Sequence, residues 1–148
     1  MLAEGSPAPD AGALDAQGKP VRLAQFRGKL LVLYFYPMDF AAGSTAQAKE
    51  FAADLDLFKR TGAVVVGVST DHPTVHADFA EKNRLRFPLL SDADGSMARS
   101  FGVTLTGHTA PHVTFLIDRD GVIRKVWRKV RPWGHSEQVL AATRAIAR

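Results

Sequence analysis

Two short apolar runs stand out in the hydrophobic pattern of the chain. Residues 30–36 and residues 63–69 are almost entirely apolar, and the second run is rich in valine. Runs of this length are typical of strands that are buried on both faces of a sheet. Pro37 ends the first predicted strand, because proline has no N–H group to donate to a neighbouring strand.

Helical spacing of apolar residues follows each of these runs. In residues 45–60, apolar side chains recur every three or four positions, and Gly62 follows as a stop signal. These apolar positions are Ala48, Phe51, Leu55 and Phe58. A second helix is predicted to carry Pro73 in its first turn, where proline is well tolerated. Its inward-facing residues are predicted to be Val75, Phe79 and Ala80.

The remaining predicted elements are shorter. They are an extended arm over residues 1–12, strands at 21–23 and 87–90, a short helix at 95–101, a hairpin of residues 113–118 and 122–130, and a last helix over 136–147. The hairpin turn reads Asp-Arg-Asp-Gly, a sequence that favours chain reversal. The last helix is predicted to bury Val139, Leu140 and Ile146. This pattern predicts an α/β or α+β fold with one sheet and helices on its faces.

Composition narrows the class of protein. A chain of 148 residues with 46% hydrophobic and 23% charged residues is expected to form one globular domain, residues 1–148. The longest apolar run is too short to cross a membrane, and the N-terminus has neither a basic region nor an apolar signal core, so we expect a cytoplasmic location. The net charge of +4 weakly favours anionic partners. The absence of cysteine excludes disulfides and thiolate metal sites.

The segment from residue 30 to residue 45 resembles the active-site segment of peroxiredoxins (AhpC/TSA type) of the bacterioferritin-comigratory, or PrxQ, subfamily. That family carries Pro-x-x-x-Thr-x-x-Cys there; in this chain Pro37 is kept, Ala41 replaces the threonine and Ser44 replaces the cysteine. Five further segments are similar to the family in the expected order. They are residues 67–71, 79–82, 87–92, 115–118 and 127–135. The resemblance implies a thioredoxin-like fold, in which helices flank a central mixed β-sheet.

The resemblance also implies a chemistry that this chain has lost. In the family, the cysteine thiolate attacks peroxide and becomes a sulfenic acid, a threonine and an arginine stabilise the reacting oxygens, and thioredoxin supplies the reducing equivalents. The arginine position is His112 here, and the position of the common resolving cysteine is Lys49. A serine hydroxyl is a far weaker acid than a thiol and cannot be cycled through sulfur oxidation states. We therefore expect no thiol peroxidase activity, no cofactor, and a non-catalytic relative of the family.

Two other interpretations stay open at the level of sequence. The chain could be a cysteine-free, inactive form of a thioredoxin-dependent peroxide reductase, or an enzyme with new chemistry in which His112 serves as a base for Ser44. The simpler interpretation of Ser44 is a helix cap or a first-turn hydroxyl. Apart from these alternatives, we expect the free N–H groups of Gly43, Ser44 and Thr45 at a helix start to bind a small anion or carboxylate weakly.

The five histidines do not form a recognisable metal motif. His72 and His76 are four residues apart, but Pro73 makes the first a cap or loop residue; His108 and His112 span a loop that leads into a strand. We therefore expect no metal site. A basic run at residues 124–131 resembles a nucleic-acid patch, but strand alternation places its charges on a solvated face, so nucleic-acid binding is not expected. Both a monomer and a homodimer are compatible with the sequence.

Overall fold

The computed structural model describes residues 1–147. Its elements, in chain order, are β1 (Gly12–Leu14), β2 (Pro20–Arg22), a 3-10 helix η1 (Leu23–Phe26), β3 (Leu30–Phe35), α1 (Ala42–Ala53), α2 (Leu55–Arg60), β4 (Ala63–Ser69), α3 (Pro73–Asn83), β5 (Leu89–Ser91), α4 (Ser96–Ser100), β6 (Val113–Ile117), β7 (Ile123–Trp127) and α5 (His135–Ala147). Strands alternate with helices from β3 to β6, as the hydrophobic pattern predicts. Within the described residues, no helix has both the length and the apolar character needed to span a bilayer.

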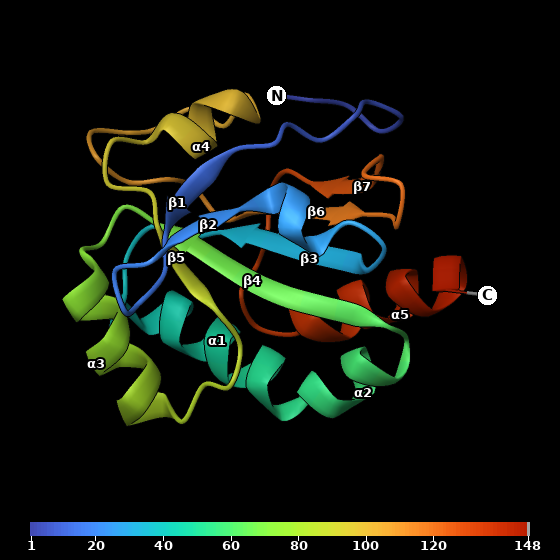
Figure 1. Cartoon of the computed structure of the whole chain (residues 1–148). Coiled ribbons are helices and arrows are strands. Elements are labelled where there is room, and N and C mark those ends of the chain that lie inside the picture. Colours follow the sequence, from blue (N-terminus) through green and yellow to red (C-terminus); the bar gives the residue numbers. More distant parts are fainter. Residues whose placement is uncertain (148) are drawn as a thin grey trace.

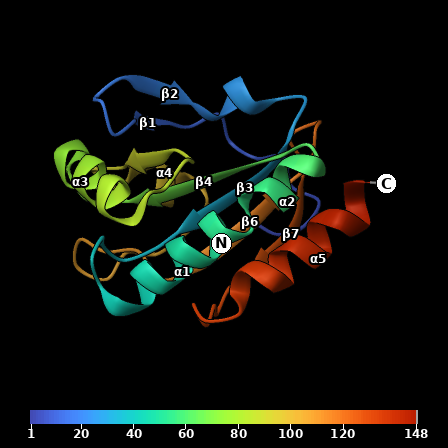
Figure 2. The ribbon, with the colours of Figure 1, turned by 90° about the horizontal axis from the view of Figure 1, so that it is seen from below.

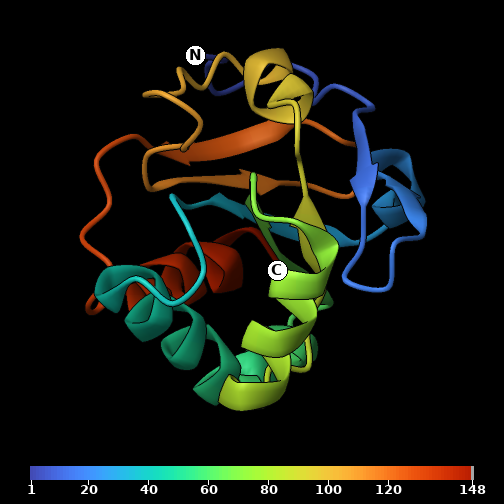
Figure 3. The same ribbon diagram turned by 90° about the vertical axis from the view of Figure 1, so that its left-hand side faces the viewer.

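Seven strands form one mixed sheet in the order β2-β1-β5-β4-β3-β6-β7. The strands β3, β4 and β5 are parallel, whereas β6 runs antiparallel to β3. Helices α1, α2, α3 and α5 cover one face of the sheet, and α4 with the N-terminal segment covers the other (Figures 1 and 2). Figure 3 shows these layers from the side. The prediction of a central mixed sheet flanked by helices is therefore confirmed.

The β3 strand is buried on both faces, which explains why its sequence is wholly apolar. Successive side chains of a strand point to opposite faces. Leu33 and Phe35 pack in one core with Phe101, which directly follows α4, and Val32 and Tyr34 pack in the other core with Phe51 of α1. Because both cores hold β3, its C-terminal end is a rigid support for the loop that leads to α1.

Two helix boundaries differ from the prediction. The α1 helix begins at Ala42, three residues before the predicted start, because its first turn contains only small residues and carries no apolar signal. The predicted single helix is also divided at Asp54, whose backbone departs from helical geometry (φ −94°, ψ 4°) and whose carboxylate accepts a 2.8 Å hydrogen bond from Ser136. The contact with Ser136 ties this break to α5, which the local sequence could not indicate.

Three smaller differences have local causes. The β5 strand begins at Leu89 rather than residue 87, because Pro88 has no N–H group to donate. The extended arm ends in a strand, β1, that hydrophobic patterning did not reveal. Val75 was predicted to face inward, but it is 36% exposed, and the neighbouring His76 is fully buried in its place.

Candidate functional site

The loop after β3 delivers the family-like motif to the start of α1. Pro37 is half-buried directly after the strand, and the chain enters α1 through Ala41, which has extended geometry (φ −64°, ψ 147°) and serves as the N-cap residue. An alanine has no side-chain oxygen, so this helix lacks the usual hydrogen bond from a cap residue to the first turn. The strand, loop and helix start are therefore arranged without help from a capping side chain.

Ser44 lies in the first turn of α1 and faces inward. The residue is 1% exposed, and its hydroxyl has no hydrogen-bond partner within residues 1–147. The structure shows no acceptor in the described chain for the N–H groups of Ala42, Gly43 and Ser44, as is usual at a helix start. The N–H group of Thr45, by contrast, donates to the carbonyl of Ala41 at 2.8 Å. The expectation of a free N–H group at Thr45 is therefore wrong, because the helix begins three residues earlier than predicted.

His112 lies next to this helix start. A Cβ atom placed on Gly43 would lie 3.7 Å from Nε2 of His112, an ordinary contact, and 3.1 Å from Cγ of Pro132, so that a larger residue would require a small shift of the proline ring. The Nδ1 atom of His112 lies 3.2 Å from Oε1 of Gln47, one turn further along α1. The amide nitrogen of Gln47 is buried without a partner in the described chain. If the Gln47 amide were rotated by 180°, Nε2 would face His112 and Oε1 would be the buried atom without a partner within residues 1–147.

Burial decides the charge of His112. It lowers the pKa of the imidazole below the ordinary value of 6.5, because a half-buried ring is poorly solvated as a cation. With Gln47 Oε1 as acceptor, the Nδ1 atom carries the proton and Nε2 keeps its lone pair. A second imidazole, that of His135, also has a lowered pKa, chiefly because it is buried. Its Nε2 atom forms a 2.8 Å hydrogen bond with the hydroxyl of Thr114. At neutral pH this site therefore lacks the permanent positive charge that an arginine would supply.

The remaining predicted site residues are only loosely connected to this centre. Lys49 is exposed on the middle of α1. The Ser44 hydroxyl forms no hydrogen bond with His112. The hydrogen bond expected of a Ser–His nucleophile pair is thus not formed within residues 1–147. What the fold does bring together is the start of α1, His112 and Gln47.

A second polar cluster lies on the other side of the loop and was missed at the level of sequence. Oδ2 of Asp39 lies 2.6 Å from Nδ1 of His76, and both side chains are 0% exposed. The phenol of Tyr36 donates to Oδ1 of Asp39 at 2.6 Å, and burial raises the pKa of this phenol well above 10.0, so it remains a donor. Asp71 accepts from the backbone N–H of Asp39 at 2.8 Å and from the hydroxyl of Ser69 at 2.6 Å. The cluster fixes the loop to β4 and α3.

This cluster is explained by hydrogen bonds rather than by a metal ion. Oxygen and nitrogen atoms of Asp39, Asp71 and His76 all lie within 4.8 Å of one another. However, Nδ1 of His76 faces a carboxylate, and Nε2 lies 3.0 Å from the carbonyl oxygen of Leu90. Both ring nitrogens therefore already have hydrogen-bond partners within residues 1–147. The arrangement is a buried pair of a histidine and a carboxyl group.

One sequence signal could have revealed this cluster. Acidic residues follow each of the three parallel strands: Asp39 after β3, Asp71 after β4 and Asp92 after β5. The C-terminal ends of parallel strands meet at one edge of a sheet, where polar residues gather. His76 lies three residues before the apolar Phe79 on α3, which places both on the same helix face. These positions together indicate a polar cluster at this edge.

Comparisons with known proteins show to which family the sequence is similar. Residues 5–126 match the AhpC/TSA family. The chain is 37% identical over 142 residues to the chloroplastic peroxiredoxin Q of Sedum lineare, covering 94% of this chain and 76% of that protein. It is 36% identical over 143 residues to peroxiredoxin Bcp of Bacillus subtilis (strain 168), covering 92% and 91%. The chain spans about two thirds of other chloroplastic relatives, 65% in one case and 66% in another.

A solved structure of a similar protein has the same fold as this chain. The crystal structure of peroxidoxin BcpB from Mycobacterium tuberculosis superposes with a TM-score of 0.91 at 36% identity, covering 99% of each chain. This likeness confirms the predicted thioredoxin-like fold.

Proposed function

Because the chain belongs to the AhpC/TSA family, with its relatives among the peroxiredoxin Q and Bcp proteins, we propose that it is a peroxiredoxin-like protein without thiol peroxidase activity. The observation that carries this proposal is the absence of cysteine from all 148 residues. Reduction of peroxide by this family requires a sulfur atom that is oxidised and then reduced again. A cytoplasmic location is part of the proposal.

The surroundings of Ser44 support loss of function at more than one position. The hydroxyl is buried without a partner among residues 1–147, Ala41 cannot cap the helix, and burial keeps His112 neutral at pH 7. A site in which only the cysteine had been exchanged would keep the threonine and the arginine of the family. Four departures, counting Lys49, favour a relative that has lost the reaction over an altered form of an active enzyme.

The test is a peroxide-consumption assay on the purified chain with thioredoxin and its reductase, and separately with dithiothreitol. We expect the rate of hydrogen peroxide loss to equal that of a sample without protein. Bacillus subtilis peroxiredoxin Bcp provides the positive control. Protein-dependent turnover that is proportional to the concentration of this chain would refute the proposal.

The second part of this proposal concerns the start of α1 around Ser44, where the family has its cysteine. This site retains weak affinity for a small anion. The donors are the N–H groups of Ala42 and Gly43, which have no acceptor within the described chain and stand at the positive end of the α1 dipole. The Ser44 hydroxyl is too deeply buried to be the first contact. His112 is the group that makes the affinity depend on pH.

The sign of that dependence follows from the lowered pKa of His112. Neutral imidazole does not attract an anion, and the cation forms only below the ordinary value of 6.5. Sulfate titrations followed by the NMR signals of the amides of residues 42–44 should therefore give a higher affinity at pH 5 than at pH 7.5. The difference should disappear in His112→Gln. Amides that do not move at tens of millimolar sulfate at either pH would refute the residual anion site.

A further inference from the structure

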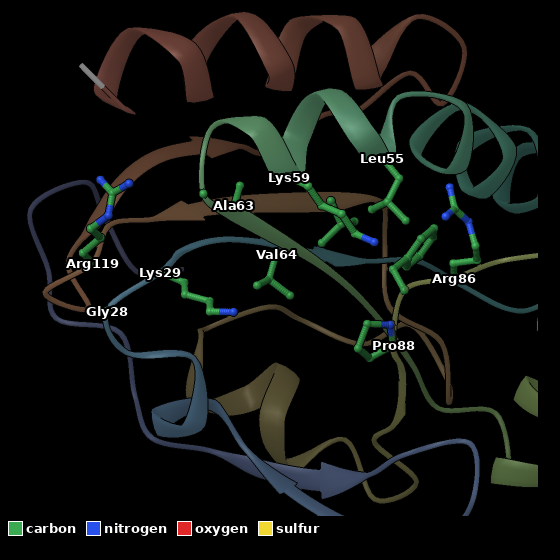
Figure 4. Close-up of a pocket in the computed structure, with 12 residues that line it drawn as sticks. Gly28, Lys29, Leu55, Lys59, Ala63, Val64, Arg86, Pro88 and Arg119 are labelled. Carbon is green, nitrogen blue, oxygen red and sulfur yellow. The ribbon is translucent and has the colours of Figure 1, made fainter.

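A basic cavity lies at the end of the sheet opposite to Ser44. Its volume is about 460 Å³, and it is formed where β3, β4 and β5 begin (Figure 4). Four cationic residues line it, each from a different segment: Lys29 before β3, Lys59 on α2, Arg86 before β5 and Arg119 in the β6–β7 turn. Segments that are distant in sequence thus gather positive charge at one place.

Most of this charge is not neutralised by the protein. Arg86 forms an exposed ion pair with Asp56 at 3.6 Å, and Arg119 donates to the carbonyl of Thr61 at 3.4 Å. Lys29 and Lys59 have no acidic partner within residues 1–147. Figure 4 shows the Lys29 amino group extending toward Val64 and the Lys59 amino group extending toward the side of the cavity where Arg86 and Pro88 lie, with the two arginines at opposite sides of the view. The cavity therefore offers at least two cations to a ligand.

The rest of the lining is apolar. Leu55 and Val65 are buried in the core beneath the cavity, and Val64, Phe87 and Pro88 contribute further carbon surface. Among the residues that the structure describes, the lining contains no carboxylate, side-chain amide or hydroxyl group. A ligand held here would find side-chain partners for negative charge and for apolar surface, but none that accepts hydrogen bonds from a sugar or a nucleobase.

We propose that this cavity binds a small amphipathic anion, in which a carboxylate or phosphate is joined to an apolar chain or ring. Lys29 and Lys59 hold the anionic group, and Val64, Phe87 and Pro88 contact the apolar part. A volume of about 460 Å³ falls within the range of roughly 300–1,000 Å³ that is typical of small-molecule sites. Because the two lysines and the apolar side chains line the same cavity, the proposed occupant is a free molecule rather than the headgroup of a lipid that remains in a bilayer.

Decanoate is a suitable probe, used below its micellar concentration. Titration of the full chain should move the NMR signals of residues 62–65 and 87, and the affinity should fall as salt is added. Lys29→Gln together with Lys59→Gln should weaken binding at least tenfold. The matched control, Lys19→Gln with Lys125→Gln, removes two exposed lysines outside the cavity and should change the affinity less than twofold. Amide spectra of both variants verify that they fold.

Three further probes separate the sources of binding. Decanol tests the apolar contact alone, inorganic phosphate tests the charge alone, and vesicles containing phosphatidylglycerol test a membrane surface. Each should bind at least tenfold more weakly than decanoate. Equal binding of decanol, an unchanged affinity in the Lys29 and Lys59 variant, vesicle binding without decanoate binding, or signal shifts confined to other residues would overturn the proposal. None of these outcomes bears on the peroxide assay, so the two proposals can fail separately.

Discussion

The buried pair between Asp39 and His76 allows a sharp test of what holds the loop before α1. Both side chains are 0% exposed, and Nδ1 of His76 lies 2.6 Å from Oδ2 of Asp39. His76→Leu keeps a side chain of comparable bulk but leaves the Asp39 carboxylate with only the phenol of Tyr36 among its side-chain partners. The loss of one partner from a buried ion pair costs about 3–5 kcal/mol, because the remaining charge is no longer compensated.

Asp39→Asn should lower the free energy of unfolding less than His76→Leu does. The amide can still accept from the Tyr36 phenol, and its NH₂ group can donate to Nδ1 of a neutral His76, whose Nε2 then donates to the carbonyl of Leu90. Only one N–H of the new amide is left without a partner, so the free energy of unfolding should fall by only about 1–2 kcal/mol. In the double variant, Asp39→Asn removes the uncompensated charge created by His76→Leu. The double variant should therefore be more stable than the sum of the single effects predicts.

Urea unfolding, followed by tryptophan fluorescence and circular dichroism, measures these free energies. For a chain of this size, 3–5 kcal/mol corresponds to a fall in melting temperature of about 10 °C or more. Asp78→Asn is the control on the same helix: its ion pair with Lys82 is 3.3 Å long but exposed, and its loss should cost no more than about 0.5 kcal/mol. If His76→Leu cost no more than this control, or if the double variant showed additive effects, the assignment of a buried ion pair would be wrong.

Three further predictions concern the start of α1. Ala41→Thr should raise the free energy of unfolding in urea by about 1 kcal/mol, because the residue already has the extended geometry of a cap and lacks only the side-chain oxygen. Ser44→Cys should react with hydrogen peroxide slowly in stopped-flow measurements, and faster when Ala41→Thr and His112→Arg are added; a rate in the single variant equal to that of peroxiredoxin Bcp would contradict a site altered at several positions. Stability should fall as pH drops below about 6.5, since burial lowers the folded pKa of His112 and the unfolded chain then binds the proton first. His112→Gln should reduce this loss between pH 7 and pH 5, as measured by urea unfolding at both values.

Much of the fold could be predicted from local pattern. The β4 strand was predicted at its observed bounds, because a strand buried on both faces produces a continuous apolar run. Proline and glycine marked the ends of β3 and α2, because their backbone limits act locally. The beginning of α1 could not be predicted in this way, since its first turn consists of small residues whose position depends on the loop packed before it.

The chemistry of the chain also depends partly on the sequence alone and partly on the tertiary structure. The absence of cysteine is a property of the sequence alone, and the proposed loss of sulfur-based peroxide reduction rests on it without any structure. The burial of Ser44, the neutral charge of His112 and the pairing of Asp39 with His76 were decided only by the tertiary structure. Each depends on how much solvent reaches a side chain and on which distant residues lie beside it, and those conditions exist only after β3, α1, α3 and β6 have packed together.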